Sequence, residues 1–131
     1  MKRLFTAVLA LALVTLFAFS GAFAADAKKE AKMQSWTGEV VDLGCYMGHG
    51  AKGEGHKECG LKCVSNGMPM GLVVGGNKVY VLTLNHDNGD AFNACKTMVS
   101  QQVKIGGTLN TKGGIQSIEV TTAEAVAAPA K

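Results

Sequence analysis

The segment GLVVGGNKVYVLTL, residues 71–84, decides the fold. Valine, leucine and tyrosine dominate its two halves, Gly71–Val74 and Lys78–Leu84, and these residue types favour strands. Between them, Gly75-Gly76-Asn77 supplies the residues that tight hairpin loops prefer. The segment therefore predicts two antiparallel strands joined by a short loop.

Three further strands are predicted outside this hairpin. One precedes it over residues 35–42, where Val and Thr favour a strand and where Trp36 and Val40 fall on one face. Two follow it, over Val103–Leu109 and Ile115–Val120, and a pair of glycines turns the chain between them. The domain is therefore predicted to be mainly β.

A helix is predicted between the third and fourth strands, over Asp90–Val99. Asp90 is a suitable N-cap, and Phe92, Cys95 and Val99 fall on one apolar face. With this helix, the order of elements is that of a five-stranded OB-like barrel in which the helix closes one end. A small open β-sheet with two helices packed on it is the alternative.

The first 24 residues have the features of a secretory signal peptide. Lys2 and Arg3 precede an apolar run, and Ala22-Phe23-Ala24 provides the small residues of a cleavage site. The run is short for a membrane span, so we expect cleavage, no remaining span, and a periplasmic or secreted location. After the signal peptide (residues 1–24) we expect a flexible spacer, one OB-like domain and a flexible tail: residues 25–33, 34–120 and 121–131.

The composition of the mature chain argues against a nucleic-acid partner. Loss of Lys2 and Arg3 lowers the formal net charge from +3 to +1 and leaves no arginine. Arginine supplies most bidentate contacts to phosphate, and the aromatic side chains that could stack on bases are few. We therefore expect no nucleic acid among the partners.

The segment between the first strand and the hairpin concentrates residues that can bind metal ions. They are Asp42, Cys45, His49, His56, Cys59 and Cys63. The Gly-rich part over residues 43–55 is expected to be a loop, and residues 56–66 a short helix. On that helix His56, Cys59 and Cys63 would project within about 60° of one another, because each residue advances by about 100°.

Such a cluster favours a thiophilic transition-metal ion. The predicted ligands are Cys45, Cys59 and Cys63, with either His49 or His56 as the fourth, and Asp42 would hold that histidine in one tautomer. Three cysteines and one histidine form a common zinc set, and soft thiolates also suit copper. Haem is not expected, because the sequence has no C-x-x-C-H motif. No acid–base pair for catalysis is evident, so the protein is expected to be a binding protein rather than an enzyme.

Two other interpretations of the cysteines stay open. An exported chain with four cysteines commonly forms two disulfides, and the loop would then be a stapled platform for an envelope protein or a small ligand. Cys59 and Cys63 are poor partners on one helix, so Cys45 would bond to one of them. The other would pair with Cys95 or stay free, and Cys95 could equally be a core residue. A thiol redox carrier that uses Cys45 with Cys59 or Cys63 is the weaker alternative.

The chain resembles a group of small exported bacterial proteins. The pattern consists of D-x2-C-x3-H from Asp42 to His49, E-C-x3-C from Glu58 to Cys63, and the strand segments Leu72–Leu82 and Val103–Val120. This group is similar to OB-fold proteins of unknown function that are sometimes placed with the tRNA anti-codon-binding-like OB domains. The resemblance implies an OB-like fold and export. In such a fold the loop between the first two strands would lie on the ligand-binding rim.

Overall fold

The computed structural model describes residues 32–127 of the chain. The predicted signal peptide, nearly all of the predicted spacer and the last four residues of the predicted tail lie outside the described residues. The elements in chain order are β1 (Gln34–Asp42), α2 (Leu43–His49), the 3₁₀ turn η1 (Glu54–His56), α3 (Lys57–Ser65), β2 (Met70–Val74), β3 (Lys78–Leu84), α4 (Asp90–Cys95), β4 (Gln102–Lys112) and β5 (Ile115–Ala125).

The five strands form one sheet that closes on itself in the order β1-β2-β3-β5-β4. The closure depends on β1, whose first part, Gln34–Glu39, pairs with β4 and whose last part, Glu39–Asp42, pairs with β2. All neighbouring pairs are antiparallel except β3 and β5, which run parallel. The predicted mainly β class with five strands is therefore confirmed. The open-sheet alternative is wrong, because β1 and β4 pair.

Glycine is required where β1 changes partner. A Cβ atom at Gly38 would collide with the backbone carbonyl of Val73 on β2. A side chain there would therefore hold β2 away from β1. The register shift of this sheet lies elsewhere, at Gly106/Gly107 on β4.

The interior of the closed sheet holds the hydrophobic core. Alternate residues of the strands point inward, as the period of a strand requires. The fully buried apolar residues of the strands include Val40, Leu72, Val103, Ile105, Ile118 and Val120. Trp36 packs against this core, with its ring centroid 5.9 Å from that of Tyr80.

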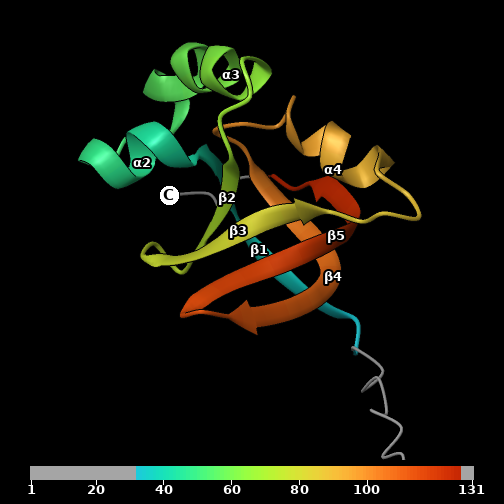
Figure 1. The fold of residues 1–131 in the computed structure, drawn as a ribbon. Helices are drawn as coiled ribbons and strands as arrows, with labels where there is room; N and C mark the ends of the chain where they lie inside the picture. Colours follow the sequence, from blue (N-terminus) through green and yellow to red (C-terminus); the bar gives the residue numbers. More distant parts are fainter. Residues whose placement is uncertain (1–31, 128–131) are drawn as a thin grey trace, which may run out of the picture.

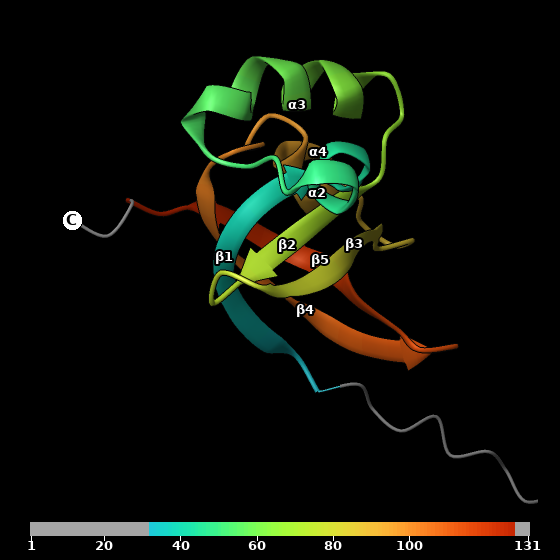
Figure 2. The ribbon, with the colours of Figure 1, turned by 90° about the vertical axis from the view of Figure 1, so that its left-hand side faces the viewer.

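The three helices gather at one end of the closed sheet, at the top of both Figure 1 and Figure 2. The segment between β1 and β2 contributes α2 and α3, and the segment between β3 and β4 contributes α4. Among the described residues, none of these helices has the length and apolar character needed to cross a membrane. The end of the sheet that carries the helices is therefore where the cysteine-rich segment lies.

Several predicted element boundaries are wrong. The chain from Leu43 is not a loop, because α2 begins there and ends at His49. The helix α4 ends at Cys95, and Gly89, rather than Asp90, occupies its N-cap position. Val99 instead forms a bridge with Val40, and the Ser100 amide donates to the Val40 carbonyl over 2.7 Å. The fifth strand continues to Ala125, because residues beyond Val120 still pair with β4.

Candidate metal centre

Asp42 organises the site at the junction of β1 and α2. Among the described residues it is the one charged side chain that is completely buried. Its Oδ1 accepts a hydrogen bond from the Cys45 amide over 2.8 Å, and its Oδ2 lies 2.8 Å from Nε2 of His56. Burial opposes the ionisation of Asp42, but these hydrogen bonds outweigh it and lower the pKa of the carboxyl below its usual value.

The same carboxylate starts the helix that carries Cys45. Asp42 has the extended backbone of an N-cap residue, and its side chain satisfies an amide of the first turn that has no helical partner. The helix ends at His49, and the C-cap residue Gly50 has a left-handed backbone (φ 72°) that lets its amide reach the Cys45 and Tyr46 carbonyls. The cap at each end therefore explains why seven residues with two glycines form α2.

The helix α3 brings Cys59 and Cys63 over the end of β1. It can approach closely because position 60 is a glycine: a Cβ atom there would lie 2.7 Å from a methyl group of Val99 and 3.4 Å from Oδ2 of Asp42. His56 precedes the helix and contacts Asp42 from the same side. Gly60 thus positions α3, although we did not single it out in the sequence. Its location between Cys59 and Cys63 does not by itself indicate a close contact with another element.

The arrangement brings three sulfur atoms together from two helices. The Sγ atoms of Cys45, Cys59 and Cys63 all lie within 4.8 Å of one another. Cys45 also belongs to a second group, in which its sulfur, a carboxylate oxygen of Asp42 and a ring nitrogen of His56 lie within 4.8 Å of one another. Cys45 thus joins the two groups, and five candidate ligand residues converge at one place. We call these five residues the thiol cluster.

The surroundings of Cys45 and Cys63 keep these two thiols protonated in the absence of a metal. Burial and the neighbouring Asp42 carboxylate raise the pKa of Cys45 to about 12. The pKa of Cys63 is also raised, first by burial and then by its neighbours Cys59 and Asp42. A metal ion would have to displace these protons, since thiolates and not thiols are its ligands.

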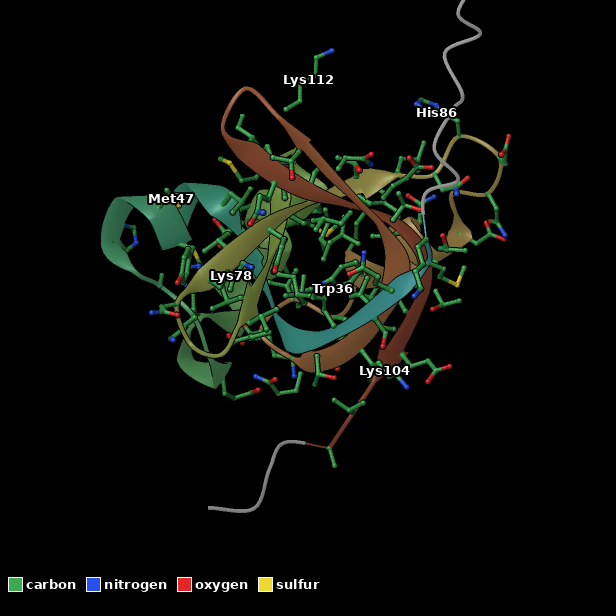
Figure 3. All side chains as sticks on the ribbon, turned by 90° about the horizontal axis from the view of Figure 1, so that it is seen from below. Trp36, Met47, Lys78, His86, Lys104 and Lys112 are labelled. Atoms are coloured by element: carbon green, nitrogen blue, oxygen red, sulfur yellow. The ribbon has the colours of Figure 1, made fainter. Side chains whose placement is uncertain are left out.

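Two of the candidate residues do not join the thiol cluster. His49 lies in the last turn of α2, is exposed, and belongs to neither group. Cys95 is completely buried in α4, where its thiol donates to the Ala91 carbonyl over 3.3 Å. The third histidine of the chain, His86, is exposed in the segment between β3 and α4, and it lies on the opposite side of the molecule from Met47 of α2 in Figure 3.

All four cysteines, which lie within the described residues, are unpaired. The prediction of two disulfides, one from Cys45 to Cys59 or Cys63 and one from the remaining cysteine of that pair to Cys95, therefore does not describe this structure. Cys95 is unpaired because it lies in the core, whereas the other three cysteines lie in the segment between β1 and β2. Cys95 is accordingly a core residue here.

Comparisons with known protein families, with curated proteins and with solved structures found no match for this chain. The case for a function therefore rests on the geometry of the thiol cluster.

Proposed function

We propose that this protein binds one thiophilic transition-metal ion, zinc or copper, in the thiol cluster, and that it performs no catalysis there. The observation that carries the proposal is the convergence of three cysteine sulfur atoms from two helices within 4.8 Å. At such a separation, small side-chain rotations are enough to let three thiolates bind one ion with metal–sulfur bonds of about 2.3 Å. They would serve as ligands together with a histidine.

His56 supports the proposal as the fourth ligand, in preference to His49. When its Nε2 donates to Asp42, a neutral His56 ring keeps the lone pair of Nδ1 for a metal ion. A carboxylate behind a histidine is the usual arrangement around zinc, because it orients the ring and increases its basicity. Asp42 would therefore act through His56 and would not need to touch the ion.

The environment of Cys45 supports binding over nucleophilic catalysis. A catalytic cysteine next to a histidine normally has a lowered pKa, because the thiolate is the nucleophile. Here burial and the Asp42 carboxylate raise the pKa of Cys45 instead. A bound cation would reverse this effect, since its charge favours the thiolates that ligate it.

The proposal includes the setting of the site. We propose an OB-like barrel, since the order β1-β2-β3-β5-β4 with one helical segment between β3 and β4 fits that architecture. The thiol cluster would then lie on the rim where such barrels bind ligands. The features of residues 1–24 support export to the periplasm or the medium, and the resemblance to small exported bacterial OB-like proteins points the same way.

A zinc titration of the reduced protein tests the proposal. We expect about one Zn²⁺ per chain, in competition with a chromophoric chelator and by native mass spectrometry. Co²⁺ should show thiolate-to-metal charge-transfer absorption. Cys59→Ser should weaken binding by at least about a hundredfold. Cys95→Ser is the matched control and should bind as the wild type does. Equal metal content in the wild type and Cys59→Ser would refute the proposal.

The two histidines provide a second matched pair. His56→Ala should weaken zinc binding about tenfold or more, because it removes a ligand and the partner of Asp42. His49→Ala should leave binding unchanged, since His49 is exposed and outside the thiol cluster. The opposite result would assign the fourth ligand to His49.

A further inference from the structure

The three thiols of the thiol cluster differ in exposure and lie on two separate helices. Cys59 is exposed on α3, whereas Cys63 on the same helix and Cys45 on α2 are half-buried. All three are reduced, and their sulfur atoms lie within 4.8 Å of one another. Adjacent thiols at this separation can also react with one another when an oxidant is present.

Helix geometry selects which pair can form a disulfide. Cys59 and Cys63 are four residues apart on one helix, where Cβ atoms lie about 5–6 Å apart. A disulfide requires about 3.5–4.5 Å, so a bond between them would distort α3. Cys45 comes from a different helix and is free of this restriction. A disulfide of this cluster should therefore join α2 to α3 through Cys45.

Exposure selects the partner of Cys45. A disulfide compound in solution reaches Cys59 first, because the other two thiols are partly covered. We propose that disulfide compounds oxidise the cluster to a Cys45–Cys59 disulfide, and that this oxidation releases the metal ion. The release rests on the metal-binding function proposed above, whereas the thiol chemistry rests on the geometry of the three cysteines.

The reaction takes place in two exchanges. The thiolate of Cys59 attacks a disulfide R–S–S–R; a Cys59–S–S–R bond forms, the S–S bond of the disulfide compound breaks, and the departing RS⁻ takes up a proton from water. The thiolate of Cys45 then attacks Sγ of Cys59 and expels the second RS⁻, which also takes up a proton from water. The two cysteines together lose two electrons, and the disulfide compound gains them and is reduced to two RSH molecules. The metal ion leaves with its charge unchanged, because two of its three sulfur ligands are now in the disulfide.

Glutathione disulfide and the zinc-loaded full-length mature protein provide the test. The wild type should lose two accessible thiols and release its zinc, and peptide mapping should locate the new bond between Cys45 and Cys59. Cys63→Ser should form the same bond. Cys45→Ser lacks the thiol that resolves the intermediate, so glutathione should remain attached to Cys59. Circular dichroism of each reduced variant verifies that it is folded.

The outcomes separate the two proposals. A reduced wild type that binds no zinc overturns metal binding, and the mapped disulfide then decides the thiol chemistry by itself. A Cys45–Cys59 bond in a protein that retains its zinc overturns the proposed release. A Cys59–Cys63 bond in the wild type, or Cys45→Ser without glutathione on Cys59, overturns the assigned order of attack.

Discussion

The closed sheet and the segment between β1 and β2 are held in place by different forces. The sheet surrounds a continuous apolar core, whereas α2 buries no residue completely and α3 buries only Gly60 and Val64. In α3, Val64 belongs to the core and Leu61 packs against it. Polar contacts add to this packing, above all those that Asp42 makes with the Cys45 amide and with His56. The two helices therefore depend on little apolar burial, on one buried carboxylate and, in our proposal, on a metal ion.

The largest expected effect is on the sheet. Ile118→Ala removes a completely buried side chain from the core and should lower the free energy of unfolding by about 3–4 kcal/mol in urea denaturation. Ile115→Ala, three residues earlier on β5, is the matched control because that side chain is 60% exposed. Its effect should stay within about 0.5 kcal/mol. Equal losses for the two variants would contradict the assigned core.

A smaller effect is expected when the contacts of Asp42 are removed. Asp42→Ala removes the N-cap of α2 and the partner of His56. The two losses together should lower the free energy of unfolding by about 2 kcal/mol. Hydrogen exchange should accelerate at the amides of α2 while those of the strands keep their protection. Asp87→Ala, at an exposed position, should change neither quantity. A uniform loss of protection over the sheet would show that Asp42 supports the whole fold and not only the helices.

Zinc affinity should increase with pH. The raised pKa values of Cys45 and Cys63 keep both thiols protonated near pH 7, and a metal ion must displace each proton to bind the thiolate. Each proton released at the site increases the apparent affinity about tenfold per pH unit while the pH is below the pKa of that thiol. Competition titrations between pH 6 and about 8 measure this slope. A slope of zero would mean that no thiol proton leaves on binding.

The smallest expected effects come from two glycines of the helices, and they have opposite signs. Gly60→Ala places a methyl group 2.7 Å from Val99 and should destabilise the protein by about 1 kcal/mol, with weaker zinc binding as α3 moves outward. Gly48→Ala is the control in α2, where nothing lies within 4 Å of the added atom. It should stabilise the protein by up to about 1 kcal/mol, because alanine loses less backbone entropy than glycine in a helix. Thermal unfolding measures the change in stability of each variant as a shift in Tm. Equal shifts in Tm for the two variants would refute the close approach of α3.

The sheet could be predicted from the sequence because its signals are local. The hairpin over residues 71–84 and the glycine pair before β5 specify turns by backbone preference alone. Errors occurred where a local preference competed with a distant partner. Val99 fits the apolar face of a longer helix, but it bridges to Val40 in the structure.

The helix α2 was missed although its signals are present in the sequence. Asp42 lies three residues before Cys45, which is the usual spacing between an N-cap residue and the amide that its side chain satisfies. Gly50 directly follows the last residue of the helix, where a C-cap glycine is common. The high glycine content of residues 43–55 suggested a loop, because glycine is unfavourable inside helices. The caps at the two ends outweigh that preference.

The sequence by itself determined the five strands, the helix after the third one, and the location of the cysteine-rich segment between the first two. These features follow from residue types and spacing within a few positions along the chain. Only the tertiary structure decided that His56 and not His49 joins Asp42, that Gly60 lets α3 approach, and that Cys95 belongs to the core. These outcomes depend on how closely α2, α3 and the end of β1 approach one another. That approach is set by closure of the sheet and by one buried carboxylate, and no local pattern specifies it.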